Sequence, residues 1–209
     1  MSIADRPSQT QAVAIHLYPE VEVLDFAGPF EVFATASRVA SRLRPTAPPP
    51  FAVFTVAREA APVRARAGLR VLPDHGFADC PRVDVLLVPG GVVDAELADA
   101  RTIDWIRARA DEAGIVASVC TGAFLLAEAG LLSGRAATTH WEDLDALRAR
   151  HRDIDVRADV RWIDEGAVVT SAGIAAGIDM SLHLVARLAG RDLAVRTARQ
   201  MDVVWHERP

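Results

Sequence analysis

Short runs of apolar residues, rich in valine, isoleucine and alanine, recur along the chain. Their apolar side chains follow one another without the alternation of a half-exposed strand, so each run predicts a strand buried on both faces. Strands of this kind occur in parallel sheets that are covered by helices on both sides. The predicted buried strands cover residues 12–17, 51–57, 83–88 and 115–119.

Between and after these runs, apolar residues recur at helical spacing. Pro29 suits the first turn of a helix that begins near Gly28 or Pro29, and Gly114 suits a helix cap. The predicted helices cover residues 29–42, 102–113, 141–150, 177–188 and 192–204, with one more after residue 122 that stops at Gly130. Shorter features are a proline-rich loop over 44–50, a hairpin over 64–72, a short strand over 136–140 and a strand pair over 160–163 and 167–170.

The alternation of strands and helices predicts an α/β fold, a parallel-sheet sandwich with short antiparallel additions. A chain of 209 residues suits one domain. We expect residues 1–11, which are polar, to form a flexible N-terminus and residues 12–209 to form the single domain.

Composition narrows the functional classes. The formal charge of -5 argues against a nucleic-acid surface, and no apolar run reaches membrane-spanning length. The chain has no lysine, which excludes a Schiff-base mechanism. Its two cysteines, Cys80 and Cys120, form neither a metal-binding spacing nor a disulfide framework, so we expect a cytoplasmic protein without a metal site.

Cys120 is the residue that most resembles a reaction centre. It stands between the buried run 115–119 and the small residues that begin the next helix, which is the layout of a nucleophile elbow. Such a turn aims the side chain out of the sheet, and the adjacent helix N-terminus favours the thiolate. The alternative is that Cys120 is a small buried apolar residue, a common role of free cysteine.

Two other turns fall at the carboxyl ends of predicted strands, where open parallel sheets carry their sites. Gly90 and Gly91 could present bare N–H groups to a developing negative charge, or simply form a tight turn. Asp25 could exchange a proton with the sulfur, with a pKa raised by apolar surroundings, or it could cap a helix. His140 could complete a Cys-His pair or make a structural hydrogen bond at a helix start.

Four segments occur together in an order that resembles the ThiJ/PfpI superfamily. They are LDFAGPFEVF over 24–33, LVPGG over 87–91, SVCTGAFLLA over 118–127 and TTHW over 138–141, and the later segment over 170–180 fits as well. The resemblance covers residues 12–204 and implies a flavodoxin-like fold, similar to the class I glutamine amidotransferase domain. Proteolytic and amidotransferase relatives have a histidine directly after the cysteine or a distant catalytic His-Glu pair. Thr121 stands in place of that histidine, which speaks against peptidase or glutaminase activity.

Two branches of the superfamily share these segments: isonitrile hydratases and the sensor halves of AraC-type transcription regulators. Because the chain stops at Pro209, we expect no DNA-reading module and favour the hydratase branch. The resemblance then implies a cofactor-free hydro-lyase that adds water to an isonitrile. It also implies that the protein acts on a small-molecule substrate and forms a homodimer. The implied catalytic residues are Cys120, Asp25 and Thr121, with Gly90, Gly91 and Gly122 binding substrate or stabilising charge and His140 as an accessory.

Two other functions stay open at this point. One is a cysteine-based redox or ligand sensor without turnover, since a reactive elbow cysteine can be oxidised. The other is a glyoxalase-like hydration of small dicarbonyls, in which His140 would have a larger part.

Overall fold

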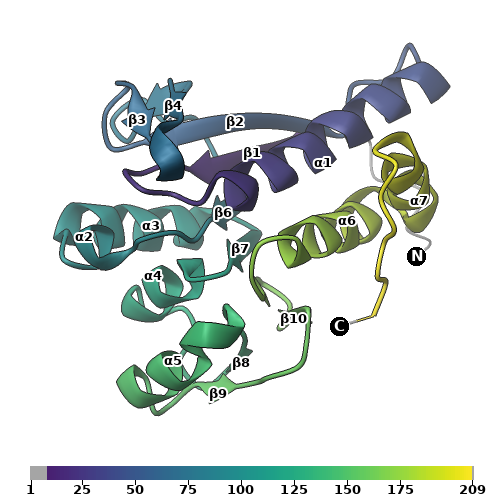
Figure 1. Ribbon diagram of the computed structural model, residues 1–209. Helices are drawn as coiled ribbons and strands as arrows, with labels where there is room; N and C mark the ends of the chain where they lie inside the picture. The colour runs from purple at the N-terminus through teal and green to yellow at the C-terminus, as the bar shows by residue number, and fades with distance from the viewer. Residues whose placement is uncertain (1–8, 209) are drawn as a thin grey trace.

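A seven-stranded sheet forms the centre of the computed structural model, which describes residues 9–208 (Figure 1). Its strand order is β10-β11-β7-β6-β1-β2-β5, and every neighbouring pair is parallel except β10 with β11. The predicted parallel α/β fold is therefore confirmed. The strands of this sheet are β1 (Gln11–His16), β2 (Phe51–Ala57), β5 (His75–Gly76), β6 (Val85–Val88), β7 (Ile115–Val119), β10 (Trp162–Asp164) and β11 (Val168–Ser171).

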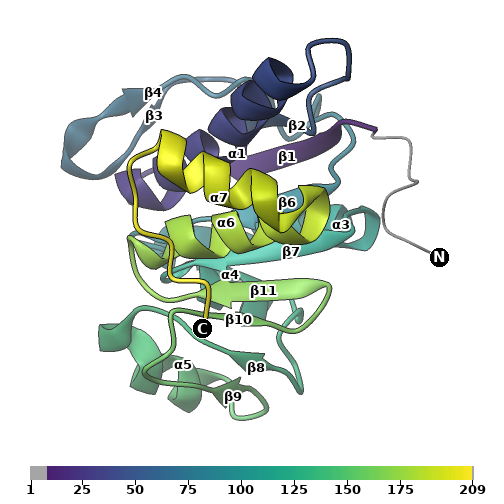
Figure 2. The ribbon, with the colours of Figure 1, turned by 90° about the vertical axis from the view of Figure 1, so that its right-hand side faces the viewer.

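Helices cover both faces of the sheet. Figure 1 shows α1, α6 and α7 on one side and α2, α3 and α4 on the other. Two small sheets, β3 with β4 and β8 with β9, lie outside this sandwich, and α5 packs beside β9 (Figure 2). The remaining bounds are α1 (Val23–Leu43), α2 (Asp94–Leu97), α3 (Ala100–Glu112), α4 (Gly122–Glu128), α5 (Leu144–Arg150), α6 (Ala176–Ala189), α7 (Arg191–Gln200), β3 (Val63–Arg64), β4 (Arg70–Val71), β8 (Ala136–Ala137) and β9 (Asp155–Val156), with 3₁₀ turns at Arg66–Gly68 and Trp141–Asp143.

The start of α1 differs from the sequence-based prediction. The helix begins at Val23, not near Pro29, because Glu22 caps it by accepting a hydrogen bond from the Val23 N–H. Pro29 then lies inside the helix, where it supplies no N–H for the usual bond to the carbonyl of Asp25. As a result, Asp25 lies in the first turn of a helix and not in a preceding loop.

The predicted glycine cap of α3 is also wrong. The helix ends at Glu112, and its cap residue Ala113 has extended backbone angles. Gly114 forms a bend after this residue, and its N–H donates to the carbonyl of Asp84 (3.0 Å). The other predicted elements occur with bounds shifted by a few residues, and Gly130 ends its helix with a φ of 79° as expected.

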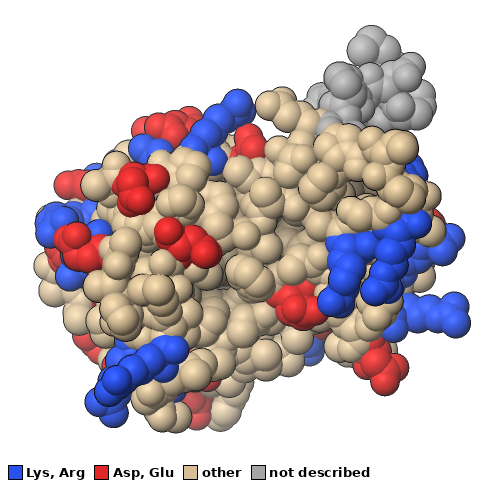
Figure 3. All heavy atoms as spheres, turned by 90° about the horizontal axis from the view of Figure 1, so that it is seen from above, with Lys and Arg blue, Asp and Glu red and all other residues tan. Residues whose placement is uncertain are grey.

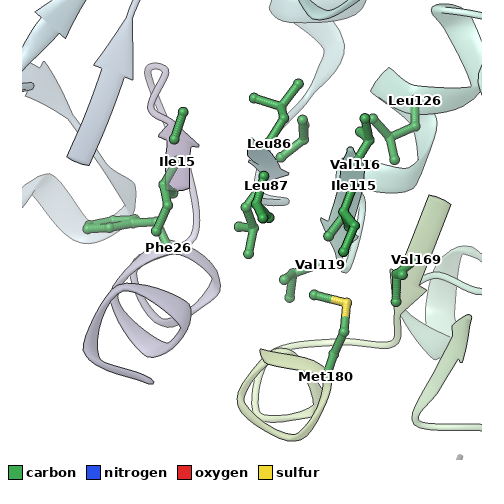
Figure 4. Packing of buried hydrophobic residues seen from close by; sticks show 14 of the residues in the cluster. Ile15, Phe26, Leu86, Leu87, Ile115, Val116, Val119, Leu126, Val169 and Met180 are labelled. Atoms are coloured by element: carbon green, nitrogen blue, oxygen red, sulfur yellow. The ribbon is translucent and has the colours of Figure 1, made fainter. Parts of the chain in front are cut away.

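The core consists of two apolar layers, one on each face of the sheet. Figure 4 shows Val119 and Val169 facing Met180 of α6, while Leu126 of α4 packs on the other side of β7. All four of these residues are 0% exposed. Because the two middle strands β6 and β7 are buried along their whole length, the ends of these strands are held rigidly.

Charged side chains of both signs lie around the margin of the face shown in Figure 3, and its centre is largely uncharged. Within residues 9–208, no helix combines the length and the apolar character needed to cross a membrane. The predicted flexible segment 1–11 lies mostly outside the described residues, and Gln11 already belongs to β1.

Candidate active site

The candidate site lies at the carboxyl ends of three neighbouring strands. Strands β7, β6 and β1 are adjacent in the sheet, and they end at Val119, Val88 and His16. The turns that follow them carry Cys120, the Gly90–Gly91 pair and the segment that leads to Asp25. Parallel order therefore brings together three segments that are far apart in the chain.

Cys120 occupies a strained turn between β7 and α4. Its φ is 56°, a left-handed value that is unusual for a residue with a side chain. The turn is held on both sides, because the Cys120 N–H donates to the Ser171 carbonyl (3.1 Å) and the Thr139 hydroxyl donates to the Cys120 carbonyl (2.8 Å). Gly122 is required at the helix start, since a Cβ there would collide with the Val88 carbonyl. This geometry is the strand–turn–helix layout of an elbow, and the role of Cys120 as a nucleophile stays a prediction.

Asp25 is fully buried behind the elbow, in the first turn of α1. The Gly90 N–H donates to its Oδ2 atom (3.1 Å), whereas Oδ1 has no hydrogen-bond partner among the described residues. The Cys120 thiol nevertheless lies close enough to act on this carboxyl group. This carboxyl group therefore keeps an oxygen with unused hydrogen-bonding capacity next to the sulfur.

The pKa of Asp25 is raised from 3.8 to about 7. Burial is the main cause, and the charge of Glu22 adds to it; the Gly90 N–H, the Cys120 thiol and the charge of Arg66 act in the opposite direction. The predicted rise of this pKa by burial is confirmed. Near neutral pH the carboxyl group is thus present in both protonation states, as a general acid and base requires.

The prediction of a resting thiolate is wrong. The pKa of Cys120 is raised to about 12, mainly by burial and then by the charge of Asp25. The backbone N–H and the hydroxyl of Thr121 lower it, but α4 is only a seven-residue helix and these contacts do not compensate for burial. At neutral pH Cys120 is a thiol that must transfer its proton when it reacts.

The expected anion hole at Gly90 and Gly91 is also not supported, because both N–H groups are used within the protein. The Gly90 N–H binds Asp25, and the Gly91 N–H donates to the Thr121 hydroxyl (2.9 Å). That hydroxyl donates in turn to the Gly91 carbonyl (2.9 Å). The two glycines and Thr121 therefore fix the position of the acid and of the elbow.

A pocket of about 490 Å³ opens in front of Cys120. Thr121 and His140 line it as well, so the structure brings these sequence-predicted residues to one cavity. Three of its charged residues are paired. Arg66 binds Glu22 within the lining (3.2 Å), and Arg150 binds Glu128, which lies outside it. The lining residues are Glu22, Arg66, Gly91, Val92, Val93, Asp94, Leu97, Cys120, Thr121, Phe124, His140, Glu142, Asp143, Ala146, Arg150 and Ile174.

His140 has a structural role at the edge of this pocket. Its Nδ1 accepts a hydrogen bond from the Glu142 N–H (3.4 Å), which caps the 3₁₀ turn, and lies 3.6 Å from a carboxylate oxygen of each of Glu142 and Asp143. Gly173 packs against the other side of the ring. Of the two readings of His140, the helix-start hydrogen bond is the one that the geometry favours.

The family model described as the DJ-1/PfpI family matches residues 11–187, which is most of the chain and includes every element of this site. The chain belongs to the DJ-1/PfpI family. It is 38% identical to an isonitrile hydratase of Pseudomonas putida over 187 residues, which cover 89% of this chain and 75% of that protein. It is 32% identical to the HTH-type transcriptional regulator CdhR of Pseudomonas aeruginosa over 92% of this chain, but spans only 55% of that regulator.

Solved structures of the DJ-1/PfpI family have the same fold. A ThiJ/PfpI family protein from Pseudomonas syringae superposes with a TM-score of 0.81 at 32% identity and covers 94% of this chain and 76% of that one. DJ-1beta of Drosophila melanogaster superposes with a TM-score of 0.79 at 20% identity and covers 94% of this chain and all of that one. The second likeness bears on the fold alone.

Sequence analysis of this DJ-1/PfpI protein missed one buried polar residue near the site. Tyr18 is 1% exposed, and its hydroxyl donates to the Pro89 carbonyl (3.0 Å). Its place directly after the first strand, at the same sheet edge as Cys120, was a signal that could have singled it out. Glu22 and Arg66, which also act on Asp25, could not be found in this way because neither directly follows a strand of the central sheet.

Proposed function

We propose that this protein is an isonitrile hydratase, which adds water to R–N≡C and gives an N-substituted formamide. The observation that carries the proposal is the pairing of the elbow thiol of Cys120 with the buried, partly protonated carboxyl group of Asp25 beside a pocket. The 38% identity to an isonitrile hydratase supports the choice of substrate.

In the first half of the reaction, the Cys120 sulfur attacks the terminal carbon of the isonitrile. The Asp25 carboxylate takes the thiol proton and returns it to the same carbon, so that R–NC and Enz–SH give the thioimidate R–N=CH–S–Enz. A thiol with a pKa of about 12 reacts slowly on its own, and Asp25, with a pKa of about 7, is the adjacent base that accepts its proton.

In the second half, water adds to the thioimidate carbon. Asp25 removes a proton from the attacking water and delivers it to the imine nitrogen, which gives R–NH–CH(OH)–S–Enz. The carbon–sulfur bond then breaks, the proton of the new hydroxyl passes through Asp25 to the sulfur, and R–NH–CHO leaves. In this scheme the Thr121 hydroxyl positions the water, since it lines the pocket and is itself held by Gly91.

The test is turnover of a small alkyl isonitrile, followed by the formyl proton of the product in NMR spectra. We expect formamide from the unaltered protein and none above background from Cys120→Ser. Asp25→Asn should lose about 10²–10⁴-fold in rate, the usual contribution of a general acid and base. The matched controls Cys80→Ser and Asp145→Asn, both away from the pocket lining, should retain full turnover. Formamide production that survives Cys120→Ser would contradict the proposal.

A sensor without turnover is the second candidate function, and the similarity to CdhR over 92% of the chain is what favours it. In this case, an isonitrile or peroxide would modify Cys120 without release of product. The neutral state of the thiol disfavours peroxide sensing, because the thiolate is the form that is oxidised. Stoichiometric modification of Cys120 with no formamide would select the sensor.

The proposal also covers the oligomeric state, the cofactor requirement and the cellular location of the enzyme. We propose a homodimer that acts without a cofactor on a small molecule. Two free cysteines fit a reducing compartment, and we place the enzyme in the cytoplasm. Sedimentation of the purified protein tests the dimer, and a monomer at micromolar concentration would rule it out.

A further inference from the structure

The turn Pro89–Gly90–Gly91 is held in place by the segment that follows β1. The Glu22 N–H donates to the Gly90 carbonyl (2.9 Å), and Val21 forms an isolated antiparallel bridge with Gly91. Both of these interactions join backbone groups. The glycine turn that binds Asp25 is thus connected to the segment that leads into the helix of Asp25.

One side chain also holds the Pro89–Gly90–Gly91 turn in place. The Tyr18 hydroxyl donates to the Pro89 carbonyl (3.0 Å) in a buried position, directly before the glycine pair. Space around the turn is tight, because a Cβ at Gly90 would lie 2.6 Å from the Thr121 nitrogen and 2.9 Å from Oδ2 of Asp25. A small displacement of Pro89 therefore changes the hydrogen bond that Gly90 makes to the acid.

We propose that Tyr18 is a positioning residue of the reaction, whose hydroxyl holds the Pro89–Gly90 turn where the Gly90 N–H binds the Asp25 carboxylate. This inference rests on the proposed function for its catalytic meaning, but the link between Tyr18 and Asp25 is a property of the protein alone. A purely structural role would require only that the ring fill its buried place between the neighbouring side chains.

The charged groups around the pair come from several elements. Those that act on Asp25 are Glu22, Arg66 and Cys120, in addition to the Gly90 N–H. The pKa of Tyr18 is raised, first by burial and then by the charges of Asp25, Glu96, Cys120 and Glu22. The ring of His16 lies 5.3 Å from the Tyr18 ring. After burial, the charge of Asp25 has the largest effect on the pKa of Tyr18. Ionisation of Asp25 should therefore change the electrostatic environment of the Tyr18 ring.

The first test measures the titration of Asp25 without any substrate. In protein labelled with ¹³C at the aspartate carboxyl groups, the Asp25 resonance is assigned as the one that Asp25→Asn removes. Tyr18→Phe keeps the ring and deletes the hydroxyl, and we expect it to raise the pKa of Asp25 by about half a unit to one unit, because the Gly90 N–H stabilises the charged form less well. The pH profile of kcat/KM for isonitrile should move upward by the same amount.

Thr197→Val is the matched control, since it removes another fully buried hydroxyl that donates to a backbone carbonyl (2.7 Å), on α7. It should leave the Asp25 titration unchanged. An Asp25 titration that is the same in Tyr18→Phe as in the unaltered protein would overturn the inference. If isonitrile is not turned over, the proposed function fails, but the carboxyl titration still decides the part played by Tyr18.

A second measurement keeps the inference testable if Tyr18→Phe does not fold. Tyr18 is the only tyrosine of the chain, so labelling with 3-fluorotyrosine gives a single ¹⁹F resonance. This resonance should shift with a midpoint equal to the Asp25 pKa, and the step should disappear in Asp25→Asn. A fluorine resonance that does not change across the Asp25 titration would contradict the link.

Discussion

Replacement of Asp25 by asparagine should stabilise the protein while it slows catalysis. The buried carboxyl group has a pKa of about 7 in the folded protein and 3.8 as its ordinary value. Between these two pH values the folded state keeps a proton that the unfolded chain has released. The folded state therefore binds more protons, and the free energy of unfolding decreases as pH rises through this range.

The size of the effect follows from the pKa shift. Each pKa unit corresponds to about 1.4 kcal/mol, so the rise from 3.8 to about 7 makes the ionised carboxylate about 4 kcal/mol unfavourable above pH 7. Asparagine has nearly the same volume and can still accept the Gly90 hydrogen bond, but it has no charge to bury. We expect Asp25→Asn to gain about 2–4 kcal/mol at pH 8.5, part of the gain being offset by burial of the amide.

Urea unfolding followed by tryptophan fluorescence, at pH values between 4.5 and 8.5, measures this difference. The increase in the free energy of unfolding caused by Asp25→Asn should be close to zero at pH 4.5. It should grow by up to about 1.4 kcal/mol per pH unit and level off above pH 7. Asp145→Asn is the control, because the Asp145 side chain is 96% exposed and should show no such trend. A stability difference for Asp25→Asn that is independent of pH would refute the electrostatic reasoning.

Two further predictions concern the thiol and the glycine turn. In a Cys80→Ser background, alkylation of Cys120 by iodoacetamide should accelerate about tenfold per pH unit from pH 7 to 10, because its pKa is about 12; a plateau below pH 9 would contradict the neutral thiol. Gly90→Ala should reduce turnover about 100-fold, since its Cβ would lie 2.6 Å from the Thr121 nitrogen. Gly114→Ala, whose Cβ meets nothing closer than 3.7 Å, should keep normal rates, and equal activity of the two variants would argue against a crowded turn.

The strands and the elbow could be predicted because local sequence determines them. Buried parallel strands need uninterrupted apolar runs, and the run 115–119 is followed at once by Cys120 and the glycine that the turn requires. The start of α1 was missed for a local reason. Pro29 is typical of a first helical turn, but the Glu22 cap, which glutamate seldom provides, starts the helix six residues earlier.

The chemistry of the site could be predicted only in part. Burial of Asp25 follows from its apolar neighbours in the sequence, and its raised pKa follows from that burial. The protonation of Cys120 and the use of the Gly90 and Gly91 N–H groups depend on contacts between segments far apart in the chain. The Gly90 N–H binds Asp25, 65 residues away, and the Gly91 N–H binds Thr121, 30 residues away. No pattern along the chain reveals such contacts, so the thiolate was a wrong prediction, and the anion hole stays a prediction that the hydrogen bonds of the two N–H groups do not support.

The most direct test of the account is intact-protein mass spectrometry after rapid acid quenching of the protein with an alkyl isonitrile. The account predicts an added mass equal to one isonitrile molecule, which is present in Cys80→Ser, absent in Cys120→Ser, and followed by release of formamide. Formamide production without any adduct on Cys120, or an equal adduct in Cys120→Ser, would contradict a thioimidate on the elbow cysteine.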